Sequence, residues 1–219
     1  MIEDKGFLFE ECQNSIKLIG LNHRFINDLV IPDVVNGKPV KIIASDVFKG
    51  LTGLKLLCIP DCIEAIGSRA FSHCQNLTRV SVYKTKWPAK ILEINENAFL
   101  HCVQMTNFSS HVPLFLYRDA FANCKKLSNL NATVVYCGSY SFRNCNNLEQ
   151  LAFDEGVVWM ADSFNNCNKL STLIFNGKIS KSVIHDSQSL DAVHEKTLIC
   201  KSDFPHVDLV YQGFKIKIV

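Results

Sequence analysis

One eight-residue motif recurs along the chain at nearly constant spacing, and this repetition limits the possible folds more than any other feature. It stands as AFSHCQNL at residues 70–77, and each copy has an aromatic or aliphatic residue in its second position. These residues are Phe48, Phe71, Phe99, Phe121, Phe142, Phe164 and Ile184, separated by 23, 28, 22, 21, 22 and 20 residues. Units of about 20–29 residues are typical of leucine-rich repeats, so the spacing predicts a solenoid of stacked coils.

A second pattern follows each copy of the motif and predicts one short strand per coil. Segments such as LKLLCI (54–59) and LTRVSV (77–82) alternate apolar residues with other residues, and this alternation is typical of a strand with one buried face. A further, mostly apolar residue lies five positions before each motif aromatic: Ile43, Ile66, Ile94, Leu116, Cys137, Trp159 and Ile179. Because one coil cannot enclose all these side chains, we expect neighbouring coils to share one core.

These residues carry a family resemblance. The run at residues 29–82 resembles the BspA-like leucine-rich-repeat proteins, whose coils follow the pattern L-x-x-I-x-I-P-x-x-V-x-x-I-G-x-x-A-F-x-x-C. In this chain the pattern is met by Leu54, Leu57, Ile59, Pro60, Ile63, Ile66, Gly67, Ala70, Phe71 and Cys74. The resemblance implies a right-handed superhelix of mainly short parallel β-strands with short helical or turn segments. It also implies an extracellular or cell-surface protein that adheres to host proteins, and it supplies no catalytic residues.

The two ends of the chain carry different patterns, and we expect β-rich caps there. The segment GFLFEECQNSIKLIG predicts a hairpin, and Asn36-Gly37 is the strongest short hairpin signal. TLICK and FKIKIV predict strands, the latter with Phe214, Ile216 and Ile218 on one face. We therefore expect a capping hairpin and first half-coil at 1–39, about seven repeats at 40–197, capping strands at 198–219, and a complete fold.

Composition narrows the functional classes. A net charge of +2 is too small for a nucleic-acid partner, and no apolar run approaches the roughly 18 residues that membrane insertion requires. The start MIEDKGFLFEE lacks the apolar region of a secretory signal. A cytoplasmic location is therefore the alternative to the extracellular one that the resemblance implies, and a column of free thiols also fits a reducing compartment.

Cysteines and histidines recur within the motif, and a structural interpretation competes with a chemical one. One repeat position holds Cys74, Cys102, Cys124, Cys145 and Cys167. We expect these residues to form a buried column of free thiols. A metal site is one alternative, but it needs ligands that converge, whereas stacked coils point these side chains in parallel. Disulfides between neighbouring coils are the other alternative, and they need Cα separations of about 4.4–6.8 Å. The position before it holds His73 and His101, but asparagine in later coils, which indicates a polar surface site or hydrogen bonding to a turn.

No constellation in the sequence is typical of catalysis. HExxH, GxSxG, GxGxxG and P-loop motifs are all absent. We therefore expect a protein that is not an enzyme and that has no catalytic residues, no metal and no cofactor.

The 28-residue spacing between Phe71 and Phe99 marks an insertion, VYKTKWPAKI. Insertions in repeat proteins form loops, often on a binding face. The loop contains Tyr83, Lys84, Lys86, Trp87 and Lys90, and a basic loop with aromatic residues suits protein recognition. The alternative is that Trp87 folds back over a coil edge while the lysines keep the loop soluble.

The strand pattern also predicts which side chains face outward from the sheet. With Leu57 and Ile59 inward, the outward set is uncharged apart from Arg79, and its candidate binding residues are Arg79, Ser81, Asn107, Asn129, Asn131, Gln150 and Thr172. We expect this concave face and the loop to bind another protein, from a host or extracellular matrix, or a glycan, as a monomer. Two alternatives are a structural or self-assembling scaffold and a sheet face that is merely soluble.

Overall fold

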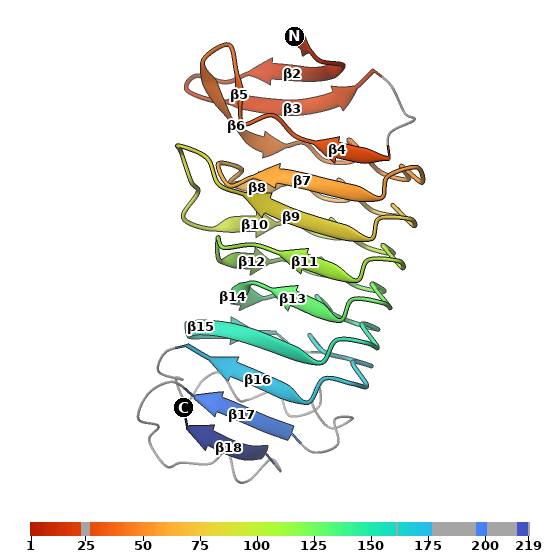
Figure 1. Cartoon of the computed structure of the whole chain (residues 1–219), viewed down its shortest axis with the longest axis vertical. Helices are drawn as coiled ribbons and strands as arrows, with labels where there is room; N and C mark the ends of the chain where they lie inside the picture. Colours follow the sequence, from red (N-terminus) through yellow and green to blue (C-terminus); the bar gives the residue numbers. More distant parts are fainter. Residues whose placement is uncertain (23–26, 161, 177–195, 201–213, 219) are drawn as a thin grey trace.

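The predicted solenoid is confirmed by the computed structural model, which describes residues 1–22, 27–160, 162–176, 196–200 and 214–218. Coils stack along the long axis of the molecule in the order of the sequence (Figure 1). Within the described residues the connections between strands are turns and bends, and no helix occurs. The short linking segments that we expected as helices or turns are therefore turns.

Each central coil contributes two strands, one to each of two parallel layers. The first sheet contains β4 (Asp28–Val30), β7 (Leu56–Pro60), β9 (Arg79–Tyr83), β11 (Asn107–Ser109) and β13 (Asn129–Asn131). The second contains β6 (Lys38–Ile43), β8 (Ala65–Ile66), β10 (Leu92–Ile94), β12 (Leu114–Leu116) and β14 (Thr133–Cys137). The first-sheet strands come from the alternating segments, and the second-sheet strands carry the apolar residues five positions before each motif phenylalanine.

The two layers join at one long strand. β15 (Gln150–Trp159) pairs in parallel with β14 on one side and with β16 (Thr172–Phe175) on the other. Figure 1 shows β15 and β16 continuing the front layer below β13. β17 (Lys196–Cys200) and β18 (Phe214–Ile218) follow in parallel pairing, so the predicted C-terminal strands extend the sheet. The predicted positions of Ile179, Ile184 and the side chains of β18 lie outside the described residues.

The N-terminal end is antiparallel, unlike the coils. β2 (Phe7–Glu11) and β3 (Ile16–Leu21) form the expected hairpin, and β1 (Ile2–Asp4), which the sequence pattern did not reveal, pairs with β2. β3 then pairs in parallel with β6. β5 (Val34–Val35) turns back onto β6 through Asn36-Gly37, whose φ angles of 50° and 75° suit a type I′ turn.

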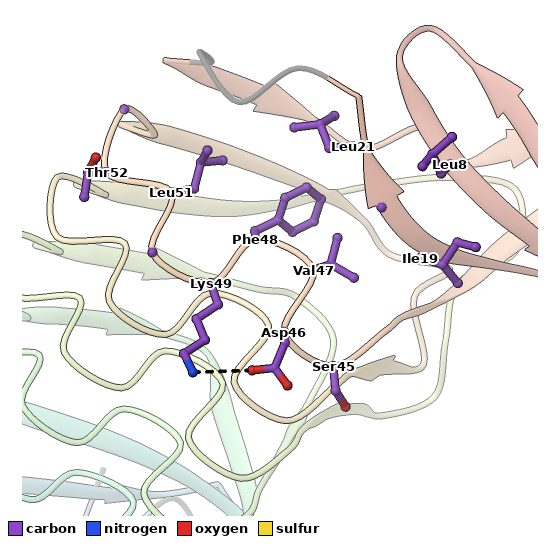
Figure 2. A pocket seen from close by; sticks show the side chains of 13 residues that line it. Leu8, Ile19, Leu21, Ser45, Asp46, Val47, Phe48, Lys49, Leu51 and Thr52 are labelled. Carbon is purple, nitrogen blue, oxygen red and sulfur yellow. Dashed lines mark ion pairs between the residues drawn. The ribbon is translucent and has the colours of Figure 1, made fainter.

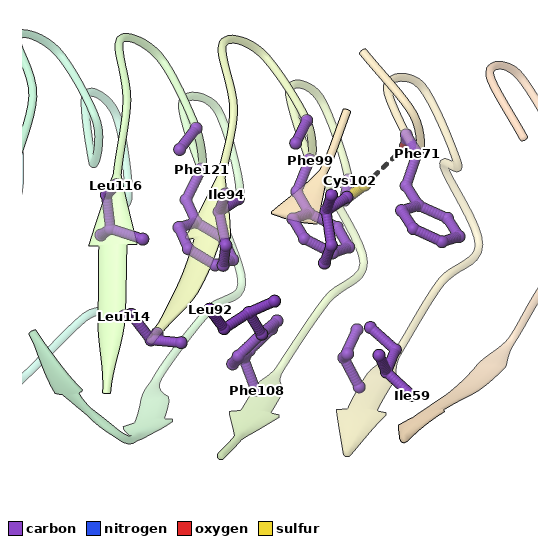
Figure 3. Close-up of a cluster of buried hydrophobic side chains, with 14 of the residues drawn as sticks. Ile59, Phe71, Leu92, Ile94, Phe99, Cys102, Phe108, Leu114, Leu116 and Phe121 are labelled. Carbon is purple, nitrogen blue, oxygen red and sulfur yellow. Dashed lines mark hydrogen bonds between the residues drawn. The ribbon is translucent and has the colours of Figure 1, made fainter. Parts of the chain in front are cut away.

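The third side of each coil is the turn segment that contains the motif, hereafter the arch (residues 44–54 in the first coil, 67–77 in the second). Its phenylalanines are buried and form one stacked column (Figure 3). Ring centroids lie 5.0 Å apart for Phe48–Phe71, 5.2 Å for Phe71–Phe99 and 5.3 Å for Phe99–Phe121. Phe71, Phe99, Phe121 and Phe142 each stack between rings of both neighbouring coils, so the column holds the coils together.

Backbone hydrogen bonds join each arch to the next. The N–H groups of Arg69, Phe71 and His73 donate to the carbonyls of Glu96, Ala98 and Leu100 at 3.0, 2.8 and 2.7 Å. The pattern recurs in later coils and always runs in one direction, from the N–H of one arch to the carbonyl of the following arch. The stack is therefore polar, with carbonyl acceptors toward the N-terminal end and N–H donors toward the C-terminal end.

One position of each motif adopts a left-handed backbone, which accounts for the residues that the motif tolerates there. The position between phenylalanine and cysteine has φ values of 60–69° and holds Gly50, His73, His101, Asn123, Asn144 and Asn166. Glycine, asparagine and histidine are among the residues that adopt this conformation most readily. Sequence reasoning placed this position correctly at a polar surface but did not detect its backbone conformation.

Candidate binding surface

The outward side chains of the first sheet lie in register across neighbouring coils. Arg79 is opposite Asn107, which is opposite Asn129, and the row Ser81–Ser109–Asn131 runs beside it. Leu57 and Ile59 are buried as expected. The predicted alternation is therefore confirmed, and it brings Arg79, Ser81, Asn107, Asn129 and Asn131 onto one face.

Most of these polar groups are not used within the protein. The side chains of Arg79, Asn107 and Asn131 make no hydrogen bond or ion pair with any described residue, and the same holds for Gln150 and Thr172 on the adjoining β15 and β16. By contrast, asparagines at the arches bond to one another, with Asn144 donating to Asn123 at 2.8 Å. The sheet face thus retains donors and acceptors that no described residue uses, whereas these arch asparagines are bonded to one another.

The N-terminal end of the same face carries two exposed apolar side chains and one carboxylate, Asp28, which lies opposite Leu56. Val30 is 59% exposed and Leu56 38% exposed, and Val30 lies in register with Cys58, which is in turn beside Ser81. The face therefore combines a small apolar region at one end with a longer row of amides and hydroxyls.

The inserted loop is attached to the solenoid through a buried carboxylate. Asp61 is only 3% exposed and accepts hydrogen bonds from the Thr85 amide at 2.8 Å and the Thr85 hydroxyl at 2.5 Å. His111 Nε2 lies 2.9 Å from its other oxygen. Burial alone would raise the pKa of Asp61, but the hydrogen bonds from Thr85 and His111 hold it below its ordinary value.

Neither Thr85 nor His111 was a candidate in the sequence, and nothing local marks them. Asp61 and His111 are 50 residues apart and meet only because the coils stack. Tyr83 was a candidate, but its hydroxyl donates to the Ile31 carbonyl at 2.6 Å, so this group holds the fold together.

The tip of the loop remains exposed. Lys84, Lys86 and Lys90 are exposed without an ion pair to any described residue, and Trp87 is 44% exposed. Residues 88–91 line a groove with Ile42, Ala65 and Glu93, on the outward side of the second sheet. The structure therefore places Lys90 beside the second sheet, and Tyr83 and the amide-rich row on the first.

An aromatic cluster on the second sheet was missed in the sequence. Phe115 of β12 stacks on Tyr136 of β14 with centroids 4.2 Å apart, and Tyr117 lies 5.0 Å from Phe115. The alternation in LFLY (114–117) could have revealed it, because Leu114 and Leu116 are buried and the aromatic residues between and after them face outward.

The described residues contain neither a cluster of metal-ligating side chains nor a membrane-spanning helix. No group of three or more histidine, cysteine, aspartate or glutamate side chains is placed to hold a metal ion in the part of the chain that the structure describes. That same part contains no helix long and apolar enough to cross a membrane.

Comparison with known proteins places the chain among repeat proteins. A model of the BspA type leucine rich repeat region matches in six copies, over residues 21–131 and 93–194. No curated protein matches the sequence. Among solved structures, a leucine rich repeat protein of T. pallidum is 23% identical, with a TM-score of 0.62 over 78% of this chain and 80% of that one.

Two further structures share the fold at lower identity. A leucine rich cell surface protein from Faecalibacterium prausnitzii is 18% identical, with a TM-score of 0.57 over 91% of this chain and 70% of the other. A leucine-rich repeat protein from Bacteroides ovatus is 18% identical, with a TM-score of 0.59 over 93% of this chain and 62% of the other.

Proposed function

Because the chain belongs to the BspA-type leucine-rich-repeat family, we propose that it is a non-catalytic module that binds another protein through the outward face of its first sheet. The observation that carries this proposal is the row of polar side chains in register, Arg79–Asn107–Asn129. Arg79 and Asn107 form no side-chain hydrogen bond or ion pair with a described residue, and Asn129 forms one hydrogen bond, to the hydroxyl of its neighbour Ser128. Repeat proteins use such extended faces to hold partners.

The chemistry of the face suits a polypeptide segment. Amides both donate and accept hydrogen bonds, so they match a peptide backbone, and neighbouring strands place them about 4.8 Å apart. Arg79 adds one positive charge, and Val30 with Leu56 offers an apolar contact at the N-terminal end. The partner that fits best is an extended polar segment that ends in an apolar residue.

We further propose that the partner is a host or extracellular-matrix protein and that the module acts in adhesion at the cell surface. A biosensor panel of purified extracellular-matrix proteins tests this directly. Arg79→Ala/Asn107→Ala/Asn129→Ala should weaken binding at least about tenfold, since three direct contacts are removed. The matched control is Gln75→Ala/Lys125→Ala/Asn168→Ala, three exposed residues of the arches.

Equal losses in both triple variants, or no loss in the first, would contradict the assignment of the face. If the wild type binds glycans on an array and the first triple variant does not, the partner is a carbohydrate and not a protein. Surface biotinylation of intact cells that leaves the protein unlabelled would contradict the proposed location.

A second candidate function is a self-assembling scaffold. It is favoured by the edge of β18, which pairs with no further strand among the described residues. Size-exclusion chromatography with light scattering separates the two functions, because a binding module should run as a monomer of 24.7 kDa.

A further inference from the structure

A groove of about 650 Å³ lies at the N-terminal end of the arch column, between the terminal hairpin and the first arch. Figure 2 shows Leu8, Ile19 and Leu21 of the hairpin on one side and residues 45–52 of the first arch on the other. The groove is on the arch side of the solenoid, apart from the sheet face considered above.

The groove forms because β3 of the hairpin pairs with the first coil only as far as Leu18. The Ala44 N–H donates to the Leu18 carbonyl at 2.8 Å, as its counterparts do between later coils. Beyond this point β3 pairs only with β2, with Leu21 opposite Phe7, and β3 makes no further pair with the first coil. Among the described residues, no arch therefore neighbours the first arch on its N-terminal side.

The missing neighbour leaves a row of backbone acceptors without donors. In the second arch, the carbonyls of Ser68, Ala70 and Ser72 accept N–H groups of the first arch at 3.0, 2.9 and 2.8 Å. The equivalent carbonyls of the first arch belong to Ser45, Val47 and Lys49. None of these three accepts a hydrogen bond from any residue that the structure describes.

The chemistry of the walls defines what would fit. Three carbonyls at alternate residues require three donors with the same spacing, which a polypeptide backbone presents when it takes the turn conformation of an arch. The side chains of Leu8, Ile19, Leu21 and Val47 supply apolar walls beside them. The Asp46 carboxylate is not available to a ligand, because Arg69 binds it through two hydrogen bonds of 2.8 and 2.7 Å.

We propose that this groove binds a peptide segment of a partner protein, which takes the turn conformation of an arch and adds to the column as an extra arch. Its N–H groups at alternate residues bond to the Ser45, Val47 and Lys49 carbonyls, and one apolar side chain lies against the hairpin. This is a second binding site, and it does not depend on the sheet face.

The chain supplies a probe for the test. The synthetic peptide DAFANSKKL, acetylated and amidated, reproduces residues 119–127 with serine in place of cysteine, and its arch donates N–H groups of Asp119, Phe121 and Asn123 to the following arch. Fluorescence anisotropy of the labelled peptide with the full chain should show saturable binding. N-methylation of the backbone nitrogens of the phenylalanine and the asparagine, which correspond to Phe121 and Asn123, should weaken binding at least about tenfold.

Two protein variants locate the site. Ile19→Glu places a charge in the groove wall and should abolish binding, whereas Gln13→Glu makes the same charge change at an exposed residue of the hairpin turn and should not. A thermal melt of each variant checks that it remains folded, and Val47→Glu is the replacement if Ile19→Glu unfolds.

Three results would overturn the proposal. They are no binding up to roughly 1 mM peptide, equal binding of the N-methylated peptide, and equal binding by the groove variant. Light scattering of the chain without peptide tests whether a second copy of the chain occupies the groove. Oligomers that grow with concentration and vanish in Ile19→Glu would assign the groove to a second copy of this chain instead of a partner.

Discussion

The thiol of Cys102 donates a hydrogen bond to the backbone carbonyl of Phe71, with 3.2 Å between sulfur and oxygen (Figure 3). The same bond joins Cys74 to Phe48, Cys124 to Phe99, Cys145 to Phe121 and Cys167 to Phe142. Each cysteine thus bonds to the motif phenylalanine of the preceding coil. The first copy of the motif has Leu51 at this position, where no preceding arch offers a carbonyl.

This arrangement predicts that the motif cysteines are unreactive in the folded protein. Burial raises the pKa of Cys167 to about 12 and also raises the pKa of Cys74, and only the thiolate reacts with alkylating reagents. With iodoacetamide at pH 8, Cys12 and Cys58, which are half-buried, should be labelled first. Mass spectrometry of the labelled peptides measures the order. Fast labelling of Cys102 or Cys124 in the native protein would contradict the buried column.

Substitution of His73 tests the left-handed backbone of the arch. His73 has φ of 62°, and the equivalent Asn123 and Asn144 also have 62°. His73→Asn should change the free energy of unfolding by less than about 0.5 kcal/mol, although it removes the hydrogen bond with Ser72. His73→Val should cost about 1–2 kcal/mol, because a β-branched residue disfavours this conformation. Urea unfolding measures both, and equal effects of the two substitutions would contradict the backbone explanation.

Removal of one ring tests the phenylalanine column. Phe71 is fully buried between Phe48 and Phe99, so Phe71→Ala should lower the free energy of unfolding by about 3–5 kcal/mol. Phe115→Ala is the matched control, because Phe115 is half-buried on the outward side of β12. Chemical denaturation should give a clearly smaller loss for the control. A Phe71→Ala loss no larger than the control would mean that the column does not hold the coils together.

The buried Asp61 predicts that acid loosens the inserted loop. Its pKa in the folded state is lowered from the ordinary value of 3.8, so the ionised carboxylate stabilises the folded state above that value. This contribution is lost as the pH falls through the lowered folded-state pKa. The stability difference between the wild type and Asp61→Asn should therefore be complete at pH 7 and shrink below about pH 4. Urea unfolding across this range measures it.

The control for this test is a substitution of an exposed aspartate. Asp28→Asn changes an exposed aspartate of β4 that has no ion pair with a described residue, and its effect should be small at every pH. A difference between the wild type and Asp61→Asn that stays constant from pH 7 to pH 3 would contradict the role of the ionised carboxylate.

Much of the coil could be predicted from the sequence because it depends on local periodicity. The alternation in LTRVSV (77–82) predicted that Val80 is inward and Arg79 outward, and both predictions are confirmed. The motif spacing predicted the order of the coils and the rows of equivalent residues. The candidate site on the first sheet could therefore be predicted from the sequence, because the side of a strand that a residue faces is a local property.

Other features could not be predicted, because they depend on contacts between distant parts of the chain. Asp61 gains its role from His111, 50 residues away, and Tyr83 from the carbonyl of Ile31, 52 residues away. The groove beside Ser45 depends on where β3 separates from the first coil. No pattern within a single segment records such pairings.

By itself, the sequence determined that the chain forms stacked coils around one shared apolar core, because the side chains of a solitary coil could not be buried. Only the tertiary structure decided which polar groups remain free. A backbone or side-chain group is satisfied or left unused according to what the neighbouring coil supplies. That distinction separates Asn144, which bonds to Asn123, from Asn107, whose side chain bonds to no residue that the structure describes.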